Sequence, residues 1–116
     1  MTEFEQEVES RLTNVPNEKK LIEAAAAFIL ESTPPKYSYN FSWLGRPIIQ
    51  YPQDMVAVQE IIWKVKPDLI IETGIAHGGS LILSAAMLAQ LDLEDAIKAG
   101  KTIDPSKSNR KVLAVD

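Results

Sequence analysis

The stretch "LIIETGIAHGGSLILSAAMLAQL", residues 69–91, decides the fold. It opens with a short run of aliphatic residues that ends at Glu72, which is typical of a strand buried on both faces in a parallel sheet. A glycine-rich segment, residues 74–79, follows, and apolar residues then recur at helical spacing. The pattern predicts a strand, a tight loop and a helix, and therefore a fold of the α/β class.

The spacing of the glycines excludes two common nucleotide-binding loops. A phosphate-binding P-loop needs a lysine that this segment lacks, and a dinucleotide fingerprint needs a second glycine where Ala76 stands. Backbone N–H groups at the start of a helix still favour a negative or hydrogen-bond-accepting ligand group. Gly78 and Gly79 either allow close approach of such a ligand or permit tight packing of the helix on its neighbours.

Glu72 narrows the choice of ligand further. A carboxylate at the end of the strand repels a phosphate, but it accepts hydrogen bonds from an ammonium group or from loop amides. This suits a cofactor with a positively charged amino-acid end, such as S-adenosylmethionine. A purely structural role, in which Glu72 accepts from the loop N–H groups, is compatible with cofactor binding.

The segments before this core are expected to be helical and then extended. Apolar residues at spacings of three and four predict two amphipathic helices within residues 1–35, separated at Pro16. The aromatic-rich residues 36–52 predict extended or turn structure. They form either a strap that packs Phe41 and Trp43 onto the core or an aromatic wall near a ligand.

Three further segments flank the core. Residues 52–66 predict an amphipathic helix that Pro67 ends, with Trp63 expected in the core. Residues 92–111 are polar and predict a helical turn followed by a solvated loop. The apolar run "VLAVD", residues 112–116, predicts a second strand that ends in an acid.

Composition excludes several functional classes. The chain has 116 residues, no cysteine and a formal net charge of −4, with its basic residues scattered, so nucleic acid is not an expected partner. No apolar run approaches the length of a membrane span, and the N-terminus lacks the pattern of a signal peptide. We therefore expect one soluble domain, and the lack of cysteine suits the cytoplasm.

The segment "YPQDMVAVQEIIWKVKPDLIIETGIAHGGSLILSAAML" resembles the cofactor-binding core of the cephalosporin hydroxylase and rhamnosyl O-methyltransferase family. This family is a branch of the class I S-adenosylmethionine-dependent methyltransferases. The resemblance runs from about Tyr37 to Leu91 and resumes at residues 112–116. It implies that residues 36–116 are the N-terminal part of a Rossmann-like cofactor-binding domain and that residues 1–35 are an N-terminal helical region.

The resemblance also implies which residues lie at the cofactor. Those expected around its methionine portion are Glu72, Thr73, Gly74, Ile75, Gly78, Gly79 and Ser80. Asp116, which closes the second strand, is expected to reach the ribose hydroxyls or to sit beside a metal. Physical reasoning agrees about Asp116, because ligands of open α/β sheets bind beyond the carboxyl ends of the strands. His77 is either a solvent-facing loop residue or a side chain over the cofactor or substrate.

Two features depart from the family pattern. The distance in sequence from the loop to Asp116 exceeds the about 20 residues usual before a ribose-binding acid. The sequence also stops at the second parallel strand, so the fold is expected to be truncated there. The catalytic base and the acids for any Mg²⁺ would then lie beyond residue 116. An unpaired strand edge predicts poor solubility or partner-dependent folding, such as a homo-oligomer.

The leading functional hypothesis is methyl transfer from S-adenosylmethionine to a hydroxyl group of a sugar, lipid or antibiotic-like small molecule. The first alternative is a cephalosporin hydroxylase-type enzyme, although the chain shows no set of two histidines and one carboxylate for iron. The second alternative is a non-catalytic remnant that keeps the cofactor loop. No residue present in the chain is assigned as a catalytic base.

Overall fold

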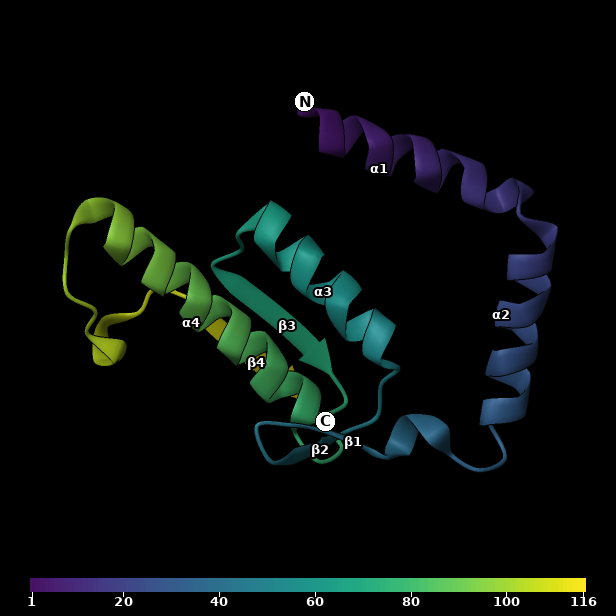
Figure 1. Cartoon of the computed structure of the whole chain (residues 1–116). Coiled ribbons are helices and arrows are strands. Elements are labelled where there is room, and N and C mark those ends of the chain that lie inside the picture. The colour runs from purple at the N-terminus through teal and green to yellow at the C-terminus, as the bar shows by residue number, and fades with distance from the viewer. The chain divides into compact units, whose positions relative to one another are not determined.

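The chain divides into two units, Met1–Tyr37 and Ser38–Asp116. The computed structural model describes all 116 residues. It contains four longer helices, an antiparallel strand pair and a parallel strand pair (Figure 1). The α/β class predicted from the sequence is therefore confirmed. No helix combines the length and the apolar character needed to cross a bilayer.

The first unit contains the two helices predicted from periodicity. They are α1 (Glu3–Asn14) and α2 (Lys19–Ser32), separated by a short 3₁₀ turn at Val15–Asn17. A capping box starts α1, because the Thr2 N–H donates to the Glu5 carboxylate at 2.6 Å and the Glu5 N–H donates to the Thr2 hydroxyl at 3.2 Å.

The aromatic segment that opens the second unit forms a β-hairpin. Its strands are β1 (Phe41–Trp43) and β2 (Arg46–Ile48), which pair antiparallel. Leu44 and Gly45 make the turn with φ values of 46° and 81°, and positive φ at both central residues is the pattern of a type I′ turn. Ile48 is only 2% exposed, so the hairpin is anchored in the interior.

The helix predicted before the first core strand is confirmed as α3 (Pro52–Val65). Lys66 ends it in the left-handed region, with φ 49°, and its N–H donates to the Ile62 carbonyl at 2.8 Å. The expectation that Trp63 is a core residue is wrong. Trp63 is 51% exposed, and the Lys66 ammonium group lies 4.4 Å from the centre of its ring. Its side chain is half exposed, and a cation can stack on its ring.

Strands β3 (Leu69–Thr73) and β4 (Lys111–Val115) pair in parallel, with Ile71 opposite Leu113. One face of this pair packs against the helices: Ile70 and Val112 meet the core of Ile62, Leu88 and Leu91.

The opposite face of the pair is exposed. Leu69, Ile71, Leu113 and Val115 are each at least half exposed there. The prediction of a strand buried on both faces is therefore wrong for the described residues, because helices cover one face only.

Helix α4 (Gly79–Ala99) is longer than the sequence predicted. Residues 92–99, expected to give at most a helical turn before a loop, continue the helix for two further turns. Gly100, with φ 62°, ends α4, and its N–H donates to the Ile97 carbonyl. The remaining connection to β4, residues 100–110, contains one short 3₁₀ turn at Pro105–Lys107.

Candidate functional site

The glycine loop, residues 74–78, turns the chain from the end of β3 into α4 (Figure 1). Gly74 and Gly78 have φ values of 80° and 84°, a region that glycine enters without steric cost. The Gly78 N–H donates to the Ile75 carbonyl at 2.8 Å and closes a tight turn. Ala76 also lies in the left-handed region, with φ 46°. The loop is thus a defined backbone structure.

Gly78 and Gly79 are glycines for different reasons. A Cβ atom on Gly79 would lie closer than 3 Å to the Pro47 carbonyl oxygen and to the backbone of Ile48. Its absence lets α4 begin in direct contact with β2, which is the packing alternative considered for this residue. A Cβ on Gly78 would meet only the side chain of Arg46, at 3.7 Å or more.

Strand β4 brings Asp116 to the glycine loop. The Gly74 N–H donates to the Val115 carbonyl at 2.7 Å, and the Ile75 N–H donates to the Asp116 carboxylate at 3.3 Å. The two parallel strands end side by side, so their carboxyl ends share one edge. The residues predicted at positions 72–80 and at 116 are therefore neighbours in space.

Glu72 connects the end of β3 to the start of α4. Its side chain is half-buried, and the Ser80 hydroxyl donates a hydrogen bond to its carboxylate. This bond joins two side chains and does not cap α4, and the N-cap residue, Gly78, has no side chain to offer. The first-turn amides of α4 therefore lack the side-chain acceptor that usually satisfies one of them. Glu72 therefore lies beside the loop as expected, but the donor to its carboxylate is the Ser80 hydroxyl and not a loop N–H group.

Thr73 and His77 complete the predicted set. Both are exposed, and neither side chain makes a hydrogen bond within the chain. The chain contains no group of three or more histidine, cysteine, aspartate or glutamate side chains placed to hold a metal ion.

Arg46 is a residue at this site that the sequence analysis missed. The hairpin places it at the start of β2, with its side-chain Cδ 3.7 Å and its Nη1 3.9 Å from where a Cβ of Gly78 would be. No ion pair or hydrogen bond engages its guanidinium group. No local sequence signal joins positions 46 and 78, since their proximity depends on how the hairpin packs against α4.

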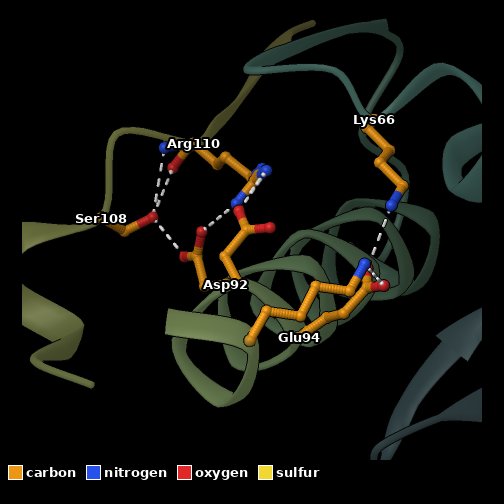
Figure 2. Close-up of polar contacts among 7 residues, drawn as sticks. Lys66, Asp92, Glu94, Ser108 and Arg110 are labelled. Atoms are coloured by element: carbon orange, nitrogen blue, oxygen red, sulfur yellow. Dashed lines mark hydrogen bonds and ion pairs between the residues drawn. The ribbon is translucent and has the colours of Figure 1, made fainter. Parts of the chain in front are cut away.

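A second cluster of charged residues lies at the other end of α4 (Figure 2). Arg110 binds Asp92 through Nη1 at 2.5 Å and Asp95 through Nη2 at 2.8 Å. The pKa of Asp92 is lowered, mainly by the hydrogen bond from Ser108 and further by Arg110, while desolvation acts in the opposite direction. The pKa of Arg110 is raised by its hydrogen bonds to the two aspartates. These contacts fix the connection before β4 onto α4.

The same end of α4 carries a smaller network around Glu94. Its carboxylate accepts from Lys98, one turn further along, and from Lys66 at 3.2 Å (Figure 2). The hydrogen bond from Lys98, partly offset by desolvation and reinforced by Lys66, lowers the pKa of Glu94. Lys66 thus ties the end of α3 to α4, and both networks serve the fold.

An apolar groove of about 580 Å³ lies between α3 and α4. It is lined by Ile62, Trp63, Met87, Leu91 and Ile97 among others, and it includes none of the residues predicted to bind a cofactor. The convergence of an arginine, two carboxylates and a glycine-shaped loop makes the loop the better candidate for a polar ligand.

Comparison with known proteins gives one match. The family model described as Rhamnosyl O-methyltransferase/CmcI matches residues 35–116, well over half of the chain. No curated protein and no solved structure matches the chain. The family resemblance drawn from residues 51–88 is confirmed, and the matched range covers the hairpin, the glycine loop and β4.

Proposed function

The chain belongs to the rhamnosyl O-methyltransferase/CmcI family, and from that membership we propose that it is an S-adenosylmethionine-dependent methyltransferase. The acceptor would be a hydroxyl group of a sugar, lipid or antibiotic-like small molecule. The family match carries this proposal. The fold expected of such an enzyme is a Rossmann-like class I domain, and the parallel pair of β3 and β4 with α3 and α4 on one face is compatible with part of one.

The shape of the glycine loop supports this assignment. Gly74 is exposed and leaves open space where a side chain would be, so a ligand can approach its backbone closely. Gly78 is buried, and the nearest side chain to it is that of Arg46. Glu72 offers a carboxylate at the end of β3, and Asp116 offers a second at the end of β4. Acids in these two places suit the ammonium group and the ribose hydroxyls of the cofactor.

The cofactor would supply an electrophilic methyl group on sulfur. The residues proposed to surround it are Glu72, Thr73, Gly74, Ile75, His77, Gly78, Gly79, Ser80 and Asp116. Within this set we assign Gly79 to shaping the start of α4, because the hairpin occupies the space beside it. Positioning of the acceptor against the methyl group would provide most of the rate enhancement.

Binding of the cofactor tests the proposal directly. Titration calorimetry with S-adenosylmethionine and S-adenosylhomocysteine should give saturable binding, and methyl label should pass to a hydroxyl acceptor. Asp116→Asn should weaken binding about tenfold, as expected when a charged hydrogen-bond acceptor is neutralised. Asp68→Asn is the matched control, because Asp68 is an exposed acid at the opposite end of β3.

The same measurements separate the alternatives. Absence of binding to the wild-type protein would refute the proposal. Binding without transfer to any acceptor would favour the non-catalytic, cofactor-binding remnant. Equal affinities of the wild type and Asp116→Asn would remove Asp116 from the site while leaving the rest of the assignment standing.

A further inference from the structure

The placement of Arg46 is determined by buried neighbours. It pairs with Trp43 across the hairpin turn, and Ile48, two residues further along β2, is 2% exposed. Pro47 and Ile48 press against Gly79, the first residue of α4. The backbone of Arg46 is therefore held against the start of α4, and its side chain extends over Gly78.

Arg46 is also the one arginine of the chain that binds no acid. Arg11 pairs with Glu7, and Arg110 pairs with Asp92 and Asp95, whereas the guanidinium of Arg46 has no partner. A guanidinium group presents five N–H donors in a planar fork that matches a carboxylate. It lies beside a helix start that also attracts negative charge.

The charges around the glycine loop are of both signs. Arg46 is positive and free, while Glu72 and Asp116 are negative and accept from Ser80 and from the Ile75 N–H. A ligand group that carries both a carboxylate and an ammonium is complementary to charges of both signs around one loop.

We propose that Arg46 binds the carboxylate of the amino-acid end of S-adenosylmethionine. This inference rests on the function proposed above. It adds a residue from the hairpin to a site otherwise assigned to the loop and β4, and it gives the hairpin a role in selecting the cofactor.

Two analogues of the cofactor separate the contribution of its carboxylate to the binding affinity from that of its other groups. Decarboxylated S-adenosylmethionine lacks only that group, and 5′-methylthioadenosine lacks the whole amino-acid end. Arg46→Gln should weaken binding of S-adenosylmethionine about tenfold to a hundredfold, since a charge-assisted bidentate contact is lost. Its effect on the other two ligands should stay within about twofold, and Arg46→Lys should give an intermediate loss, because lysine keeps the charge without the fork.

Lys111→Gln is the matched control. Lys111 is exposed, opens β4 at the end of the strand pair remote from the glycine loop, and its replacement removes the same charge. It should leave all three affinities unchanged. Circular dichroism melting of each variant establishes that the fold is retained, which is expected because the side chain of Arg46 is exposed.

The outcomes distinguish this inference from the function on which it rests. If Arg46→Gln binds S-adenosylmethionine as tightly as the wild type does, the inference is overturned and the proposed function stands. An equal loss for the decarboxylated ligand also overturns it, because Arg46 would then act on another part of the cofactor. If the wild type binds none of the three ligands, both proposals fail together.

Discussion

The two connections at the ends of α4 are held in place by different kinds of contact. The glycine loop joins β3 to the start of the helix, and its internal contacts are mainly backbone hydrogen bonds, such as Gly78 to Ile75 and Gly74 to Val115. The connection of residues 100–110 joins the other end of α4 to β4 and is held by side chains, above all by Arg110 with its two aspartates. The arginine of one connection is therefore paired with acids, whereas the arginine beside the other, Arg46, has no partner.

This difference distinguishes a structural connection from a candidate ligand site. At residues 100–110 the charges neutralise one another, as the lowered pKa of Asp92 and the raised pKa of Arg110 indicate. At the glycine loop, Arg46 has no partner and the start of α4 has no side-chain cap, because the hydrogen bond between Ser80 and Glu72 joins two side chains. Unpaired donors beside an open backbone are what a polar ligand requires.

The largest effect is expected at the first residue of α4. Gly79→Ala would push a methyl group into the Pro47 carbonyl and the Ile48 backbone, neither of which can rotate away. We expect the free energy of unfolding to fall by about 2–3 kcal/mol, as overpacking usually costs. Urea unfolding followed by circular dichroism measures this change.

Gly74→Ala is the control for Gly79→Ala. Its Cβ would meet nothing within 4 Å, but its backbone has φ 80°, so only conformational strain of about 1 kcal/mol is expected. The comparison separates steric packing from backbone conformation within one loop. Equal losses for the two variants would contradict the assignment of Gly79 to packing.

A smaller effect is expected when the charged connection is broken. Arg110→Gln would leave Asp92 and Asp95 without their cation and should cost about 2 kcal/mol, since hydrogen bonds to charged groups contribute more than neutral ones. Lys107→Gln is the control, because its pair with Asp104 at 3.6 Å is exposed and should contribute less than about 0.5 kcal/mol.

The Arg110 variant also tests the contrast between the connections. Cofactor affinity should be unchanged by Arg110→Gln, because the cluster lies at the far end of α4 from the glycine loop. Calorimetry at a temperature where the variant is folded measures this. A loss of affinity comparable to that of Asp116→Asn would show that the two connections are not independent.

The sequence predicted the local elements well where periodicity and caps agree. The strand, loop and helix of residues 69–91 are present, as are α1, α2 and α3. It failed at residues 92–99, because three acids and one lysine within eight residues resemble a solvated loop when their ion pairs with Lys66, Lys98 and Arg110 are unknown. It also missed the hairpin, whose turn relies on Leu44 in a left-handed conformation that leucine seldom adopts.

The candidate site was predictable where it follows from a local sequence pattern or from a general rule of strand arrangement. Residues 72–80 follow from the strand, glycines and helix, and Asp116 follows from the rule that strand ends meet at one edge. The contribution of Arg46 depends on the packing of β2 against α4, and the packing role of Gly79 depends on the same contact. Long-range packing leaves no periodic signal, so Arg46 was missed, and the structure was needed to choose between the two roles considered for Gly79.

The smallest effect concerns Ala76, the residue that breaks the dinucleotide fingerprint. Its φ of 46° costs a residue with a side chain about 1–2 kcal/mol, whereas glycine enters this region freely. Glycine also gives the unfolded chain more freedom, worth about 0.4–1 kcal/mol, so Ala76→Gly should raise the free energy of unfolding by only about 0.5 kcal/mol. The same substitution at Ala89, exposed within α4, should lower it by about 1 kcal/mol. Changes of opposite sign in the free energy of unfolding, measured by urea unfolding, would establish that the glycine loop is held in its left-handed turn. A decrease for both variants would show that the loop is not held in this conformation.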